Sequence, residues 1–269
     1  LLKGLDRWGV DTRAGIAVNY LTASLLAALF IESFVPERII TLLPWALAVG
    51  TAFIVVFHLT ALSAQRAGVA ATTVASKMSM IVPVLLAVAL YSEVPGTFGW
   101  IGIGLALVGV ALSTWSEDDR ANAKHRALPV LLFFAFGAID GTVSHVENRI
   151  MGSEERGVFS LLVFSTATLL GTTWTTRKDV RIALCEQRTW GVGALLGAVN
   201  FGALFCLFNA LGDSGLPTSA VFPLVNILLV CSASLGASLW FRERITNLQW
   251  VGILTACLAM ASILVAATQ

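Results

Sequence analysis

Lys77 is a charged residue near the middle of an apolar run, Gly68–Tyr91, that is long enough to cross a lipid bilayer. An ammonium group at that depth is costly unless it is paired or hydrated, so such residues mark functional sites in membrane proteins. Asp140, in another apolar run, carries the opposite charge and can neutralise it. One interpretation is a structural ion pair that locks two helices. The other is a charged wall of a substrate cavity, where an anion competes for Lys77 and a proton arriving at Asp140 releases the pair.

Two asparagines are expected at a similar depth, because a helix rises about 1.5 Å per residue. Counted from the cytoplasmic end, Lys77 is roughly 14 Å deep, Asp140 roughly 18 Å and Asn200 roughly 15 Å, and counted from the outer end Asn226 is roughly 12 Å deep. In a hydrocarbon core about 30 Å thick, all four lie near the midplane. The predicted substrate-binding residues are Lys77, Asp140, Asn200, Asn226, Ser76 and Ser144.

The run that contains Asp140 also carries a polar stripe. Asp140, Ser144 and Glu147 are spaced at i, i+4 and i+7, which places them on one face of a helix. This spacing suggests a proton relay from the outer side through Glu147 to Asp140. The alternative is that Glu147 is a solvated residue at the rim of the helix.

Further residues are candidates for moving parts. Asn19, Tyr20 and His58 fall at a shallower depth, near the cytoplasmic third of their runs, and are predicted to form an inner gate. A hydrogen-bonded packing role is the alternative for His58. Pro83 and Pro223 each remove a backbone donor and are predicted hinges, although prolines are also common in spanning helices for other reasons.

The elements that must position these residues are nine apolar stretches, each about the length of a spanning helix. The chain of 269 residues is 57% hydrophobic and 12% charged, whereas soluble domains carry about 25% charged residues. We therefore expect an all-α polytopic membrane protein. The stretches are Ala14–Phe34, Leu42–Ala64, Gly68–Tyr91, Thr97–Thr114, Leu128–Ile150, Gly157–Trp174, Trp190–Leu211, Thr218–Leu239 and Leu248–Ala267.

The cationic residues are distributed unevenly when consecutive loops are placed on alternating sides of a membrane. Cytoplasmic loops are enriched in lysine and arginine, so the rich side is predicted to be cytoplasmic and the C-terminus extracytoplasmic. The rich side holds Lys3, Arg7, Arg13, Arg66, Arg120, Lys124, Arg126, Arg177, Lys178, Arg181, Arg188, Arg242 and Arg244. The other side holds Arg38, Arg149 and Arg156.

Enzyme and metal motifs are absent from the sequence. The histidines form no HExxH pattern, and there is no GxSxG turn or glycine-rich phosphate loop. The four cysteines have no metal-ligand spacing. We therefore expect no enzyme, no metal, no cofactor and no nucleic-acid partner. Without an ATPase motif, any transport must be driven by a gradient.

An internal repeat appears at an offset of about 150 residues. Five predicted spans, an odd number, separate Glu93 from Glu243, so the equivalent loops face opposite sides of the membrane. The alternative is chance similarity between two apolar helices. The repeat predicts two inverted five-helix halves with a site near the midplane: residues 1–115 and 128–269, joined by a cytoplasmic linker at 116–127. The matched residues are Glu93 and Glu243, Trp100 and Trp250, Gly102 and Gly252, Ile103 and Ile253, and Ala106 and Ala256.

Ten helices are needed for two such halves and nine are present, so we expect a further helix before Leu1 that completes the first half. The runs at 76–79 (SKMS), 137–140 (GAID) and 221–226 (VFPLVN), with the last hairpin at 241–253, resemble the drug/metabolite transporter superfamily. Within it, the chain is most similar to the ten-helix EamA type. It departs from that type in lacking the first helix, which in the family also lines the pathway.

The resemblance and the midplane residues together predict a function. We expect a secondary transporter in the bacterial inner or plasma membrane that exports small organic solutes, amino acids or related metabolites, by alternating access. Its expected partners are the solute, membrane lipid and protons. A flippase for lipids or lipid-linked headgroups on the same fold is the alternative.

Overall fold

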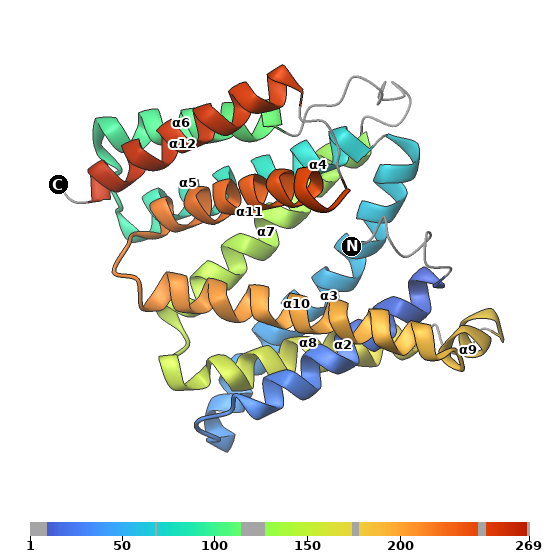
Figure 1. Cartoon of the computed structure of the whole chain (residues 1–269). Coiled ribbons are helices and arrows are strands. Elements are labelled where there is room, and N and C mark those ends of the chain that lie inside the picture. Colours follow the sequence, from blue (N-terminus) through green and yellow to red (C-terminus); the bar gives the residue numbers. More distant parts are fainter. Residues whose placement is uncertain (1–9, 68, 114–126, 174–177, 242–245, 268–269) are drawn as a thin grey trace. The chain divides into compact units, whose positions relative to one another are not determined.

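A computed structural model describes residues 10–67, 69–113, 127–173, 178–241 and 246–267, and within these ranges the chain is helical with no strands (Figure 1). All nine predicted stretches form helices, but the third is divided between two of them, and a short helix, α9, lies in a predicted loop. The helices are α2 (Thr12–Leu29), α3 (Pro36–Arg66), α4 (Val69–Met78), α5 (Ile81–Tyr91), α6 (Gly96–Ser113), α7 (Ala127–Arg149), α8 (Arg156–Thr172, after the 3-10 turn η2, Ser153–Glu155), α9 (Lys178–Leu184), α10 (Gln187–Gly212), α11 (Thr218–Phe241) and α12 (Asn247–Ala267).

Four of the described helices are long and apolar enough to cross a membrane. They are Pro36–Thr60, Thr72–Tyr91, Ala127–Arg149 and Gln187–Gly212, and three shorter apolar helices are Gly96–Leu112, Thr218–Ser232 and Trp250–Ala266. The all-helical class is therefore confirmed, and four of the described helices have the length and composition of membrane spans. The number of nine spans stays a prediction.

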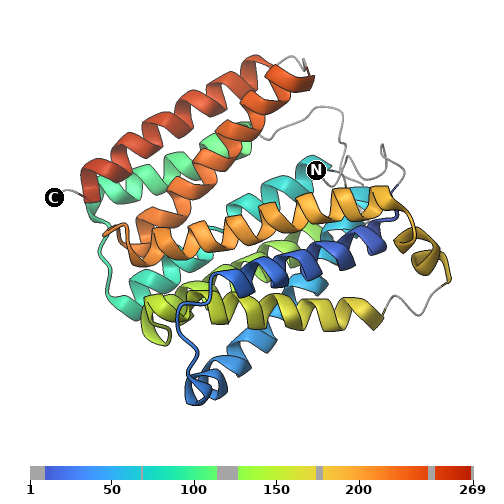
Figure 2. The ribbon, with the colours of Figure 1, turned by 60° about the horizontal axis from the view of Figure 1, so that its bottom comes forward.

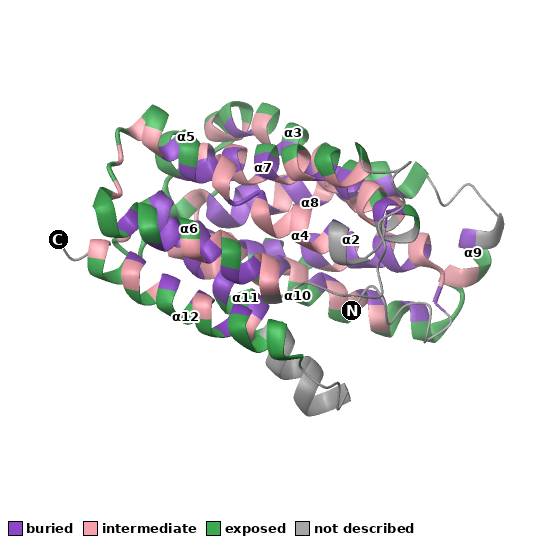
Figure 3. Ribbon diagram, turned by 90° about the horizontal axis from the view of Figure 1, so that it is seen from above, coloured by how far each residue is buried: buried purple, intermediate pink, exposed green. Residues whose placement is uncertain are grey.

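Large apolar side chains are exposed on many of these helices. Leu29 is 77% exposed, Ile40 75% and Leu169 70%, and Figure 3 shows exposed positions recurring between buried ones along the helices. Extended apolar surface of this kind is unusual for a soluble monomer. It is the surface expected of helices that contact lipid.

The chain divides into two compact units, and each takes segments from both predicted repeats. Unit 1 comprises the described parts of Leu1–Val55 and His145–Asp213, and unit 2 comprises those of Val56–Ser144 and Ser214–Gln269. The helices α3 and α7 contribute residues to both units. A unit is defined by packing and a repeat by sequence, so the predicted repeat boundaries are left untested by this division.

Unit 1 is built on α2, which packs against α8 and α10 (Figures 1 and 2). Close approach depends on glycines: a β-carbon at Gly193 would collide with Val18, and one at Gly197 would collide with the Asn19 carbonyl. Small residues at such spacing let helix backbones approach each other. The start of α8 likewise lies against the end of α2, where Gly157 contacts the Phe30 carbonyl, so these two helices are antiparallel.

Unit 2 is dominated by the pairing of α6 with α12, which lie side by side in Figures 1 and 2. Gly102 packs on the Ala259 carbonyl and Gly109 on the Gly252 carbonyl, so the two helices are antiparallel. The offset of 150 carries Gly102 to Gly252 and Gly109 to Ala259. One contact therefore becomes the other when the two helices are exchanged, as contacts across a two-fold axis do.

The third predicted stretch is interrupted between Met78, the last residue of α4, and Ile81, the first of α5. Pro83 has no N–H to donate to the Ser79 carbonyl, which accepts from Val82 N at 2.9 Å instead. The helix is therefore interrupted four residues before Pro83, while the run Thr72–Tyr91 as a whole is long and apolar enough to span a membrane. A hinge role for Pro83 stays a prediction. A proline disturbs the turn that precedes it. The interruption caused by Pro83 therefore lies at residues 79–80, close to Lys77. Pro223, by contrast, lies inside an uninterrupted α11.

Replacing Gly109 by alanine should destabilise unit 2, because the new β-carbon would meet the backbone of Gly252 and Ala256. We expect a loss of about 1–3 kcal/mol, the usual cost of overpacking, seen as a lower midpoint for heat unfolding in detergent. Gly104→Ala is the matched control on the same helix. Nothing lies within 4 Å of its β-carbon position, so it should be neutral or stabilise by up to about 1 kcal/mol. Equal midpoints for the two variants would contradict the close α6–α12 contact.

Candidate functional site

Lys77 and Asp140 both belong to unit 2, in the last turn of α4 and in α7 respectively. They interact electrostatically, and both side chains are partly buried. Neither makes a direct hydrogen bond or ion pair with another described residue. The carbonyl end of α4 also favours a cation at Lys77. Two opposite charges that attract without touching retain hydrogen-bonding capacity for a third group.

The other predicted residues of unit 2 differ in how they are engaged. The Ser76 hydroxyl donates to the Thr73 carbonyl at 2.9 Å, and the Asn226 amide donates to the Phe222 carbonyl at 3.0 Å. Both side chains therefore bond to their own helices. Ser144, one turn beyond Asp140 on α7, is buried, and His58 on α3 is exposed.

In unit 1, a predicted gate residue meets a predicted substrate residue. The Asn200 amide of α10 donates to Asn19 Oδ1 of α2 at 3.5 Å. Asn19 is 4% exposed, and its own Nδ2 has no hydrogen-bond partner among the described residues. Tyr20 is 2% exposed, with its ring 6.4 Å from that of Phe164, so it is packed in the core of this unit. A gate and a single midplane site stay predictions.

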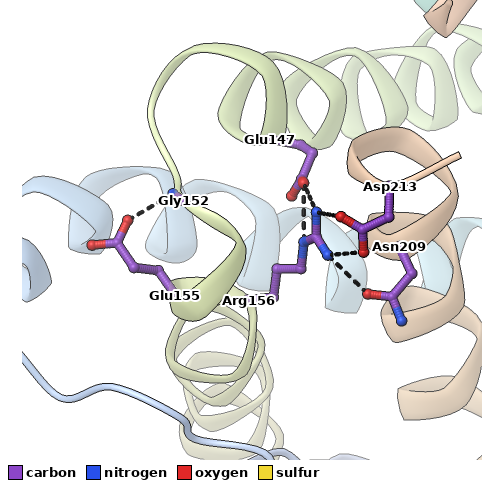
Figure 4. Close-up of polar contacts among 6 residues, drawn as sticks. All are labelled: Glu147, Gly152, Glu155, Arg156, Asn209 and Asp213. Carbon is purple, nitrogen blue, oxygen red and sulfur yellow. Dashed lines mark hydrogen bonds and ion pairs between the residues drawn. The ribbon is translucent and has the colours of Figure 1, made fainter. Parts of the chain in front are cut away.

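A dense polar network lies among the described residues of unit 1 around Arg156, the first residue of α8 (Figure 4). Its guanidinium makes five hydrogen bonds, one for each N–H donor. Nε and Nη2 donate to Glu147 Oε1 at 3.0 and 2.7 Å, Nη1 donates to Asp213 Oδ2 at 2.6 Å, and Nη2 donates to Asp213 Oδ1 at 3.0 Å. Nη1 also donates to Asn209 Oδ1 at 3.1 Å. The arginine thereby joins the end of α7 and the end of α10 to the start of α8.

The end of α10 leaves space for the guanidinium of Arg156 because it carries a glycine there. Gly212, the last residue of α10, lies directly beneath the guanidinium, and a β-carbon there would collide with Arg156 and Glu147. The carbonyl end of α10 adds negative potential at the same place. Hydrogen bonding to Asp213 raises the pKa of Arg156, and the same bond holds the pKa of Asp213 below its usual value.

A second arginine fixes the connection between α7 and α8. Arg38, near the start of α3, donates to both carboxylate oxygens of Glu155 at 2.6 and 2.8 Å and to the Ile150 carbonyl at 2.6 Å. Glu155 also accepts from Gly152 N at 2.9 Å. Two of the three cationic residues on the predicted outer side are therefore held by carboxylates.

In unit 2, Glu93 caps a helix. Its two carboxylate oxygens accept from Thr218 N at 3.0 Å and from Ser219 N at 2.8 Å, at the start of α11. A carboxylate at a helix N-terminus satisfies free donors and complements the helix dipole. A pocket of about 120 Å³ opens beside it, lined in part by Pro95, Ile103 and Pro217. The repeat singled out Glu93 without giving it a role, and the structure supplies one.

Sequence reasoning missed most of the Arg156 network. Glu147 was considered only as a rim or relay residue, and Asn209 and Asp213 were not considered at all. The signal available in the sequence was that arginine is scarce on the predicted outer side, and that Arg38 and Arg156 are nevertheless present there.

Comparisons with known proteins bear on the fold. No protein-family model matches the chain. An uncharacterized protein of Haemophilus influenzae is 24% identical over 267 residues, which covers 94% of this chain and 89% of that protein. The fold is similar to that of a protein of known crystal structure, with a TM-score of 0.54 and 15% sequence identity. The match covers 96% of this chain and 97% of the other chain. The fold is therefore shared over nearly the whole length of another solved chain.

Replacing Arg156 by glutamine should destabilise unit 1 strongly, because the buried Glu147 carboxylate would lose its cationic partner. Breaking one side of a buried ion pair costs about 3–5 kcal/mol, so the midpoint of heat unfolding should fall clearly. Arg188→Gln is the control, since Arg188 is exposed in the first turn of α10 and should change stability by less than about 0.5 kcal/mol. A similar fall in both variants would argue against the network.

Stability should also depend on pH through Glu155. The hydrogen bond from Arg38 lowers the pKa of Glu155 below its usual value. A carboxyl group with a lowered pKa stabilises the folded state at neutral pH, and this contribution is lost as pH falls through the folded-state pKa. Glu155→Gln should therefore melt lower than the unchanged protein at neutral pH and lose less stability on acidification. Melting curves across acid pH check this, with Glu154→Gln as the exposed neighbouring control; parallel curves for Glu155→Gln and the unchanged protein would refute it.

Proposed function

We propose that this chain is a membrane transporter that moves small organic solutes, amino acids or related metabolites, by alternating access. The observation that carries the proposal is the pair Lys77 and Asp140: opposite charges on helices long and apolar enough to span a membrane, interacting without direct contact. Placing a charged side chain inside a membrane costs free energy, so such residues usually belong to substrate, ion or proton pathways. Lys77 would bind an anionic group of the solute, and Asp140 would be its exchangeable counter-ion.

The pairing of α6 with α12 supports an inverted-repeat architecture for this transporter. The two helices are equivalent under the offset of 150, and they are antiparallel with contacts that exchange under it. In inverted repeats, equivalent helices run in opposite directions about a two-fold axis in the membrane plane. The equivalent helices α2 and α8 also pack together, as do α5 and α11. Membership of the EamA-type ten-helix transporters, with the C-terminus outside the cytoplasm, is part of the proposal.

The interruption between α4 and α5 supports a site near Lys77. Transporters of this kind commonly form their substrate sites where a spanning helix is discontinuous. Here Met80 N reaches the Lys77 carbonyl at 3.4 Å and the Ser79 hydroxyl bonds the Ser76 carbonyl at 2.7 Å. The helix therefore departs from regular bonding within one turn of the lysine.

Counterflow of radiolabelled amino acids in proteoliposomes tests the proposal. Lys77→Met and Asp140→Asn should each lower the rate about tenfold or more, because a hydrogen bond to a charged group contributes roughly 1.5–3 kcal/mol. Arg188→Gln is the control and should transport normally. Full activity in correctly folded Lys77→Met would remove the lysine from the site. Translocation of lipid headgroups without solute counterflow would replace the proposal by a flippase.

A further inference from the structure

Glu147 is a buried carboxylate with one oxygen unused. Its side chain is 4% exposed, and Oε1 accepts both hydrogen bonds from Arg156. Oε2 has no hydrogen-bond partner among the described residues. Leaving such an acceptor unpaired in apolar surroundings is costly. A proton on Oε2 would remove that cost without displacing either N–H of the arginine.

The charge balance of the network leaves room for one proton. Arg156 contributes one positive charge, and Glu147 and Asp213 contribute two negative charges, so the network is net negative by one. Protonating one carboxyl group makes it neutral while the guanidinium keeps the other carboxylate as partner. A network with a single carboxylate could not take up a proton without leaving a buried arginine unpaired.

Of the two carboxyl groups, Asp213 is the one that keeps its charge. Its side chain is 58% exposed, and its two oxygens are held by a two-pronged contact from Arg156. The pKa of Asp213 is lowered mainly by that bond. The charged groups that face Glu147 are Arg156 from α8 and Asp213 from α10. The imidazole ring of His145, two residues earlier on α7, packs against the ring of Trp45 on α3, with 5.4 Å between the ring centroids.

We propose that Glu147 binds a proton taken from the side of the membrane where α7 ends and α8 begins, and that this proton shifts the hold of Arg156 from α7 to α10. The proposal rests on the transport function proposed above. A solvent proton adds to Oε2 and the carboxylate becomes a carboxylic acid; no other covalent bond changes. The two bonds from Arg156 to Oε1 then lose their charge assistance, whereas the contact with Asp213 is retained.

This shift would act on a helix that contributes to both units. Glu147 lies in the last part of α7, which belongs to unit 1 from His145 onward, while Asp140 lies in the part that belongs to unit 2. The two carboxyl groups are seven residues apart and share one face of the helix. Loosening the end of α7 would therefore change the constraint on the helix that carries Asp140.

Infrared difference spectroscopy on the purified full chain in lipid tests the proposal directly. On acidification from neutral pH, a protonated-carboxyl stretching band should appear and should lose its Glu147 component in Glu147→Gln. Glutamine keeps an oxygen that accepts from Arg156, so the fold should survive. Glu154→Gln, a substitution at an exposed glutamate in the adjacent turn, should leave the Glu147 component of the band unchanged. If Glu147→Gln does not fold, Glu147→Asp serves instead and should shift that component in frequency.

A band unaltered by both Glu147 variants would overturn the inference. Solute counterflow is measured on the same samples, so the proton site and the transport function are tested independently. Transport without a Glu147 component would leave the transporter standing and assign its proton site elsewhere. A Glu147 component in a protein that transports no solute would support the proton site and contradict the transport function.

Discussion

A charge placed in apolar surroundings must be neutralised, and this requirement explains where the chain keeps its few ionic groups. Arg156 satisfies it completely, with five donors matched by two carboxylates and an amide. Arg38 satisfies it through Glu155 and a backbone carbonyl. Both networks lie where helices end, so that they fix α3, α7, α8 and α10 within unit 1. Lys77 and Asp140 are different, because they attract each other but form no direct bond with a described residue.

That difference distinguishes charges whose hydrogen bonds are all made within the protein from the pair to which a functional role is proposed. A saturated arginine holds three helix ends together and has no donor left for a ligand. Lys77 and Asp140, on two apolar helices, retain hydrogen-bonding capacity that the packing of the described residues does not use. Elsewhere in the described chain, close contact is made by glycines: Gly102 and Gly109 bring α6 against α12, and Gly193 and Gly197 bring α10 against α2.

The sequence predicted the helices well, because a helix that crosses a membrane requires a long apolar run and such runs have clear ends. It pointed to Pro83 as a place of disturbance but did not locate the interruption at residues 79–80, because a proline disturbs the turn before it and the sequence does not show which group satisfies the freed carbonyl. It also failed to join Glu147 and Arg156 to Asp213, which is 57 residues beyond Arg156, because all three look like solvated charges at helix ends. Only the return of α10 beside α8 brings them together. Asn19 and Asn200 were found individually but assigned to different roles.

The Arg156 network also shows why net charge, rather than the number of ion pairs, decides what a buried cluster can do. With one carboxylate, an arginine forms a neutral pair that a proton would break. With two, as here, a proton can be accepted by the carboxyl group that has a free oxygen while the other remains bound. The residue that permits this arrangement is Gly212, because any side chain there would occupy the place of the guanidinium. On the proposed mechanism, a backbone position therefore determines whether α10 can hold Arg156 once the bonds from Arg156 to Glu147 have lost their charge assistance.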